Sequence, residues 1–162
     1  MGCTNDNIKK ICNFYVSDWH LAVMLLPYIN KEINEGVKIT TILEKDIKNN
    51  IETLIGRLNL KNEDEILNIN WNDNSNNIEK YIQRNLDDKR QNLFIINGNK
   101  DYIENTNEKL FKCIKEKRVQ GKFIKIVDCY EIGKDDKKMY DIIKMHDGIL
   151  NTSGEYEIQK IV

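Results

Sequence analysis

The chain has 162 residues, of which 40% are hydrophobic and 31% are charged, and its net charge is −1. This length suits one domain with a full core, residues 1–162 forming a single unit, and this composition excludes a disordered chain. The near-zero charge gives no electrostatic reason to expect nucleic acid or a membrane as partner. No run of about 18 apolar residues occurs, so no transmembrane helix is expected.

Strand and helix patterns alternate about five times along the chain. Apolar runs rich in β-branched and aromatic residues predict strands over 8–15, 37–43, 65–71, 93–96 and 123–129. Apolar residues at helical spacing predict helices over 19–35, 47–58, 78–86, 101–117 and 135–146. Two short elements follow, a sixth strand at 149–150 and a final element over 156–162.

Four residues set the expected boundaries of the first two helices. Ser17 is of a helix-capping type, and Asp46 is expected to cap the second helix. Pro27 lies inside the first helix and is expected to kink it or to shorten its first part. Gly36 is suited to end it.

Alternating strands and helices predict an α/β fold with three layers. We expect a mostly parallel sheet of five to six strands, of the Rossmann-like type, with helices on both faces. Right-handed crossovers are the default, but the strand order does not follow from the sequence.

In such sheets ligands bind beyond the carboxyl ends of the strands, so the candidate site residues are those that follow each strand. Both tryptophans fall there, which suits a pocket with an aromatic wall and a few polar groups. The predicted ligand-binding residues are Tyr15, Asp18, Trp19, His20, Glu44, Trp71, Asn97, Tyr130 and Glu131. Polar loops occur at strand ends in any fold of this class, so a set of unrelated loop residues is the alternative.

Nucleotide-binding motifs are absent from the expected positions. The turn after the first strand, residues 15–20, has no glycine and no lysine, and Gly133-Lys134 is followed by Asp135 instead of Ser or Thr. A phosphate loop needs glycines whose N–H groups surround the phosphate and a lysine that reaches it. No G-x-G-x-x-G occurs. Walker-type ATP hydrolysis and dinucleotide binding are therefore disfavoured.

Histidines and cysteines give no clear catalytic or metal pattern, so no cofactor is predicted. His20, beside Asp18, suits either a general base or metal ligand, or a plain capping and surface residue. His146 suits a half-buried structural histidine near a helix end. The four cysteines form no C-x-x-C pair, and reduced buried thiols are expected.

Several stretches resemble the MEDS domain, a sensory module of bacterial and archaeal signalling proteins. The first unit reads Phe14-Tyr15-Val16-Ser17-Asp18, then Leu25-Leu26-Pro27-Tyr28-Ile29, then Gly36-Val37-Lys38-Ile39. The last unit reads Cys129-Tyr130-Glu131 and then His146-Asp147-Gly148-Ile149-Leu150. These motifs are short. The histidine that often opens the first strand is replaced near that place by Lys10, and the middle segment is abbreviated.

The resemblance implies a RecA-like fold without a P-loop and a role in sensing small organic molecules. Family members are often fused to kinase or DNA-binding modules, so this chain would act through a signalling partner protein. We therefore expect a cytoplasmic, non-catalytic ligand-sensing domain. The alternatives are a small nucleotide- or phosphate-binding enzyme without a Walker motif, or an interaction protein that dimerises through an edge strand or a helix face.

Overall fold

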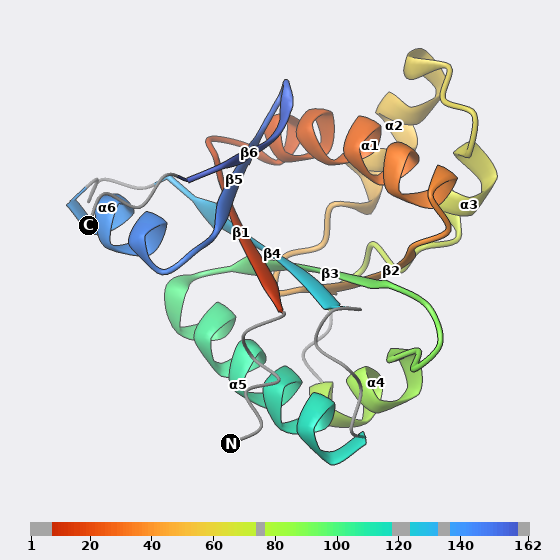
Figure 1. Cartoon of the computed structure of the whole chain (residues 1–162). Helices are drawn as coiled ribbons and strands as arrows, with labels where there is room; N and C mark the ends of the chain where they lie inside the picture. The colour runs from red at the N-terminus through yellow and green to blue at the C-terminus, as the bar shows by residue number, and fades with distance from the viewer. Residues whose placement is uncertain (1–7, 74–76, 118–123, 133–136, 159–162) are drawn as a thin grey trace.

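The computed structural model describes residues 8–73, 77–117, 124–132 and 137–158. Strands and helices alternate along most of this length (Figure 1). The strands are β1 (Lys9–Tyr15), β2 (Lys38–Leu43), β3 (Asn92–Gly98), β4 (Ile124–Glu131), β5 (Gly148–Asn151) and β6 (Gly154–Glu157). The helices are α1 (Asp18–Asn34), α2 (Lys48–Leu58), α3 (Glu63–Leu67), α4 (Ile78–Asn85), α5 (Lys100–Lys117) and α6 (Lys137–Lys144).

The strands form one open sheet in the order β2-β3-β4-β1-β5-β6. All neighbouring pairs are parallel except β5 and β6, which form an antiparallel hairpin at one edge. β1 lies inside the sheet, with Cys12 beside Asp128 of β4 and also beside Ile149 of β5. The α/β prediction, with a mostly parallel sheet covered by helices, is confirmed.

Two hydrophobic cores lie on opposite faces of the sheet. One contains the buried residues of α1, α2 and α3, and the other contains those of α4, α5 and α6. Figure 1 shows these two groups of helices on opposite sides of the strands. The strands alternate between the two cores, so Val127 and Cys129 face the first core, whereas Ile126 and Tyr130 face the second. Asp128 therefore points into the second core.

The predicted strand over 65–71 is wrong. Residues 63–67 form the short helix α3, and the chain then turns to bring Trp71 into the first core. The indole Nε1 of Trp71 donates a hydrogen bond to the carbonyl oxygen of Ile66, 2.9 Å away. An apolar run of this length does not by itself distinguish a strand from a short buried helix.

Two expectations for the first two helices were wrong: the effect of Pro27 on α1 and the cap of α2. α1 runs unbroken through Pro27, because Pro27 and Val23, whose carbonyl loses its partner, both lie on the exposed side of the helix. α2 has Ile47 as its N-cap, without a side-chain cap. Asp46 instead accepts a hydrogen bond from the backbone N of Lys48 in a local turn, at 3.1 Å. Ser17 does cap α1, and its Oγ accepts from the backbone N of His20.

The predicted final element over 156–162 corresponds to β6 (Gly154–Glu157), and residues 159–162 lie outside the described residues. The predicted helix over 135–146 is α6, and residues 135 and 136 also lie outside them.

An ion cluster fastens the β5–β6 hairpin to the sheet. Nζ of Lys125 lies 3.0 Å from Glu32 and 3.1 Å from Glu155, and Lys9 also pairs with Glu155. The hydroxyl of Tyr28 donates to the same Glu155 carboxylate at 3.0 Å. The two lysines and two glutamates balance, so the cluster carries no net charge.

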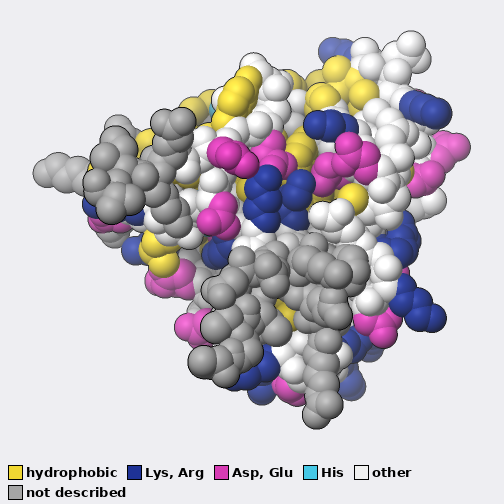
Figure 2. Space-filling model, in the orientation of Figure 1, with side chains coloured by type: hydrophobic (Ala, Val, Ile, Leu, Met, Phe, Trp, Pro, Cys, Tyr) yellow, Lys and Arg dark blue, Asp and Glu magenta, His cyan; other side chains and the backbone are white. Residues whose placement is uncertain are grey.

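No helix within the described ranges is long and apolar enough to cross a membrane. On the face of the molecule seen in Figure 2, basic and acidic side chains are interspersed instead of gathering into a patch of one sign.

Candidate functional site

The helices that follow β1 and β4 pack on opposite faces of the sheet, α1 on the first and α6 on the second. The carboxyl ends of these adjacent strands therefore form a switch point, where open α/β sheets have a crevice. Tyr15 and Glu131 lie side by side at this point as register partners. Only some of the ligand-binding residues predicted from the sequence lie near this point.

Three of the predicted residues are buried supports of the fold. Tyr15 and Trp71 belong to the first core, each 2% exposed. Asn97, at 0% exposure, accepts hydrogen bonds through Oδ1 from the backbone N of Glu44 at 2.9 Å and from that of Lys45 at 3.4 Å. Asn97 thereby fixes the β2–α2 loop against β3.

Glu44 lies close to the end of β3. Its carboxylate accepts a hydrogen bond from the backbone N of Asn99 at 2.8 Å. A Cβ added at Gly98 would lie 2.7 Å from this carboxylate and 2.9 Å from Cβ of Glu44, so the two loops meet closely. Glu44 therefore joins two loops of the carboxyl edge.

Asp18, Trp19 and His20 lie in the first turn of α1. Asp18 pairs with Lys45 at 3.3 Å, so it also bridges to the β2–α2 loop. Nδ1 of His20 accepts a hydrogen bond from the backbone N of Val16 at 3.0 Å. The side chain of Trp19 is 49% exposed and belongs to neither core.

Burial raises the pKa of the Tyr15 hydroxyl, and the negative charges of Glu131, Asp18 and Glu44 raise it further. Tyr130 is different, because its side chain lies on the opposite face of the sheet.

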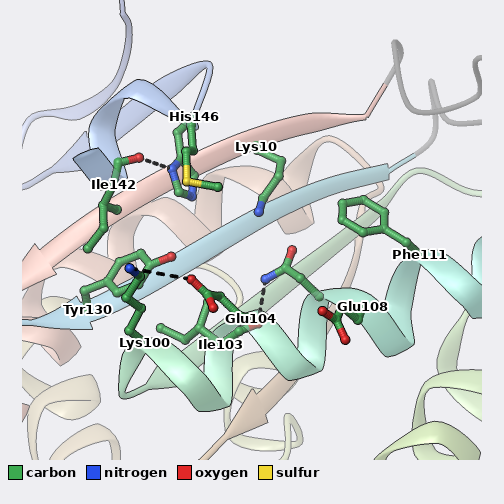
Figure 3. A pocket seen from close by; sticks show the side chains of 11 residues that line it. Lys10, Lys100, Ile103, Glu104, Glu108, Phe111, Tyr130, Ile142 and His146 are labelled. Carbon is green, nitrogen blue, oxygen red and sulfur yellow. Dashed lines mark hydrogen bonds and ion pairs between the residues drawn. The ribbon is translucent and has the colours of Figure 1, made fainter. Parts of the chain in front are cut away.

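Tyr130 opens onto a pocket between α5 and α6 (Figure 3). The cavity measures about 390 Å³, within the range of small-molecule sites. One face of α5 forms its floor, through residues spaced three or four apart. The lining residues are Lys10, Lys100, Ile103, Glu104, Asn107, Glu108, Phe111, Tyr130, Ile142, Met145 and His146.

A buried carboxylate organises the wall of this pocket. Oδ2 of Asp128 lies 2.9 Å from Nζ of Lys10 and 2.8 Å from Nε2 of His146. Oδ1 accepts a hydrogen bond from Nδ2 of Asn107 at 2.9 Å. Asp128 is completely buried, and a buried charge of this kind requires such partners.

These partners keep Asp128 ionised. Burial raises the pKa of the Asp128 carboxyl, but the hydrogen bond from His146, the charge of Lys10 and the hydrogen bond from Asn107 together lower it more. The pKa of Asp128 therefore lies below its ordinary value. Four segments are joined at this one side chain: β4, the start of β1, the middle of α5 and the residues after α6.

The imidazole of His146 has both nitrogens engaged. Nδ1 lies 2.7 Å from the carbonyl oxygen of Ile142, and Nε2 faces Asp128. Both ring nitrogens therefore already have a polar partner. His146 consequently has no free nitrogen to act on a molecule in the pocket.

The side-chain amide of Asn107 has a determined orientation. Its Nδ2 donates to the carbonyl oxygen of Ile103 at 2.9 Å as well as to Asp128. A flipped amide would place its oxygen against these two acceptors, so the flip is excluded. The oxygen Oδ1 is left buried and without a hydrogen-bond partner among the described residues.

Aromatic and apolar groups complete the pocket. Tyr130 contacts His146 edge to face, with centroids 6.1 Å apart, and stacks on Phe14. Figure 3 shows the Tyr130 hydroxyl directed into the pocket, and Lys10 between His146 and Phe111 with its ammonium directed toward α5. Nζ of Lys10 lies 5.9 Å from the Phe111 ring centroid.

Cys12 lies beside Asp128 in the sheet and does not supply a nucleophile. Burial and the charge of Asp128 raise the pKa of its thiol to about 12. The thiol therefore stays protonated near neutral pH. Among the described residues no group of three or more His, Cys, Asp or Glu side chains could hold a metal ion.

The sequence prediction found Tyr130 of this pocket and missed Lys10, Asn107 and Asp128. A signal was available for Asp128, because an acid in the middle of the apolar strand Ile124–Glu131 alternates with Ile126 and Tyr130 toward the core. Such an acid requires a buried partner. Its pairing with Lys10 depends on β1 lying next to β4, which the sequence did not predict.

Comparison with known proteins adds no assignment to this site. No family model matches the sequence, and no curated protein matches it.

Proposed function

We propose that this chain is a non-catalytic sensing domain that binds a small organic molecule in the pocket between α5 and α6. The observation that carries the proposal is the cavity itself, with apolar walls and convergent polar groups from β1, α5 and the segment after α6. The site differs from the predicted carboxyl-edge set and shares only Tyr130 with it.

Binding without catalysis is supported by the state of the reactive side chains. Both nitrogens of His146 are engaged, Asp128 already has three partners, and the thiol of Cys12 has a raised pKa. A general acid or base needs a free position within hydrogen-bond distance of the reacting atom. These groups shape the pocket instead of offering such a position.

A sensing role is supported by the position of the cavity. Its lining joins Ile103 and Glu108 of α5 to Ile142 of α6 and to Met145 just beyond it. A ligand that contacts both α5 and α6 would favour one distance between these helices. A partner protein that binds both helices would then bind the ligand-bound form with a different affinity. The MEDS resemblance implies a role of the same kind, but no family model supports it, so the proposal depends on the cavity.

A fragment screen tests the proposal. Wild-type protein would be screened by thermal shift against small alcohols, amides, amines, carboxylates and nucleotides. A fragment at 100 times its dissociation constant adds about 2.7 kcal/mol, which raises the melting temperature by roughly 5–10 °C for a domain of this size.

Two matched variants locate the binding. Glu108→Trp fills the rim of the pocket, whereas Glu116→Trp makes the same change at an exposed position of α5 outside the lining. We expect hits that bind the wild type and Glu116→Trp but not Glu108→Trp. If no fragment binds, or if every hit binds Glu108→Trp equally well, the proposal is wrong.

An interaction role has one specific observation in its favour. Trp19 and Val23, four residues apart in α1, are 49% and 42% exposed, and Val16, just before the cap residue Ser17, is 63% exposed. Such a stripe suits a protein partner or a second copy of the chain. Sedimentation analysis of the wild type and of Trp19→Ala would test self-association. A wild type that remains monomeric at high concentration would exclude the second copy.

A further inference from the structure

Two side chains of the pocket, Lys10 and Asn107, can form further hydrogen bonds. Both already bond to the carboxylate of Asp128. Nζ of Lys10 is a triple donor and lies 2.9 Å from Oδ2 of Asp128. Asn107 donates to the other oxygen of that carboxylate at 2.9 Å. Its own Oδ1 is buried and unpartnered, in a residue that is only 5% exposed. The donor and the acceptor therefore belong to side chains that bond the two oxygens of one carboxylate, and both side chains line the pocket.

We propose that the pocket selects a small carboxamide with an apolar body. This inference depends on the proposed function and names the ligand class for the same site. The amide oxygen of the ligand accepts from Lys10, and its N–H donates to Oδ1 of Asn107. The apolar body packs on Ile103, Phe111 and Ile142, which line the same cavity.

Both lysines that line the pocket already have acidic partners. Lys10 is paired with Asp128, and Lys100 lies 3.8 Å from Glu104. A carboxylate ligand would accept from Lys10 but would bring a second anion near Asp128 and face Oδ1 of Asn107 with another acceptor. An ammonium ligand would satisfy Asn107 but would bring a second cation near Lys10. A carboxamide supplies both functions in one planar, uncharged group.

Entry of the ligand requires the movement of a side chain in the pocket wall. Oδ1 of Asn107 exposes less than 1 Å², so a donor reaches it only when a neighbouring side chain shifts. The Lys10 side chain is 22% exposed and lies on a flexible stem, so its ammonium can move while staying bonded to Asp128. The ligand oxygen then takes a second N–H of the same ammonium.

Four probes with one skeleton test the ligand class: phenylpropanamide, its N,N-dimethyl amide, phenylpropylamine and phenylpropanoate. The dimethyl amide keeps the acceptor and removes the donor. We expect phenylpropanamide to bind at least about fivefold more tightly than each of the others, because each alternative leaves a buried polar group of the pocket unpaired or adds a charge. Calorimetry measures the four affinities.

The hydrogen bond from the ligand N–H to Oδ1 of Asn107 is tested separately, through the NMR signals of the Asn107 side-chain amide. During a titration with phenylpropanamide, we expect the ¹H–¹⁵N signals of this amide to shift with the affinity measured by calorimetry. Asn105, exposed on the same helix, provides a matched amide that should not shift. No mutation is needed, so loss of folding cannot obscure the result.

The outcomes separate the two proposals. If the dimethyl amide, the amine or the carboxylate binds as tightly as phenylpropanamide, and Glu108→Trp blocks that binding, the carboxamide inference is overturned while the pocket assignment stands. The same holds if other fragments bind in a Glu108-dependent way and none of the four probes does. If nothing binds the wild type, both proposals are overturned.

Discussion

Nε2 of His146 lies 2.8 Å from Oδ2 of Asp128, and both side chains are almost completely buried. This contact ties the end of α6 to the middle of β4, on the wall of the pocket. Lys10 and Asn107 bond to the same carboxylate from β1 and α5. The pocket therefore depends on an ionised acid that the sheet holds inside the second core.

Asp128→Asn should destabilise the fold. The substitution removes the fully buried negative charge that balances Lys10 and places a neutral amide against His146, which costs about 3 kcal/mol. Urea denaturation monitored by circular dichroism measures the loss. Asp141→Asn, at an exposed position of α6, is the control and should change the stability by less than about 0.5 kcal/mol. An Asp128→Asn protein as stable as the wild type would contradict the role given to this carboxylate.

The contribution of Asp128 should disappear in acid. Its pKa in the folded protein lies below its ordinary value of 3.8, so its stabilising effect is complete above that value. The effect is lost as the pH falls through the lower, folded pKa. We expect the difference in unfolding free energy between wild type and Asp128→Asn to shrink as the pH falls below 3.8 and through the lower pKa of the folded protein. A difference that stays constant over this range would show that Asp128 is not the titrating group.

Glu155→Gln should loosen the β5–β6 hairpin. Glu155 accepts from Lys9, Lys125 and Tyr28, so neutralising it leaves Lys125 with Glu32 alone. We expect a loss of about 1–3 kcal/mol and faster hydrogen exchange in β6. Glu157→Gln, exposed on the same strand, is the matched change and should leave exchange unaltered.

Alanine substitutions at two glycines, Gly98 and Gly56, should change the stability of the protein in opposite directions. At Gly98 a Cβ would lie 2.7 Å from Oε1 of Glu44 and 2.8 Å from the ring of Tyr102, so Gly98→Ala should cost about 1–3 kcal/mol. At Gly56, in α2, the added Cβ meets nothing within 4 Å. Gly56→Ala should therefore stabilise the protein by about 0.5–1 kcal/mol, through its helix propensity. Melting temperatures that move in the same direction would refute this account of the β3–α5 turn.

The fold class could be predicted because local patterns determine it. The strands at Lys9–Tyr15 and Ile124–Glu131 and the long helix Lys100–Lys117 agree with the sequence prediction to within two residues at each end. The prediction for the segment 65–71 was wrong because Trp71 is buried in the first core, among residues of α1 and α2 that a local pattern does not contain. Strand order is also non-local, and it places Lys10 beside Ile126.

The candidate site was predicted less well for the same reason. The carboxyl-edge rule led to residues such as Asn97 and Trp71, which the structure uses to hold loops and core. The pocket instead extends along one face of the sheet, from Tyr130 at the carboxyl end of β4 to Lys10 near the start of β1. Convergence of a lysine, an acid, an amide and a histidine from four segments requires the folded arrangement.

A ¹H–¹⁵N titration with the tightest fragment from the screen tests the central claim most directly. The account predicts that the largest backbone shifts occur at Lys10, Asn107, Tyr130 and His146, in the wall of the α5–α6 pocket. Shifts concentrated instead at Asp18, Trp19, His20 and Glu44 would place the ligand at the carboxyl ends of β1 and β2. That result would contradict the assignment of this pocket.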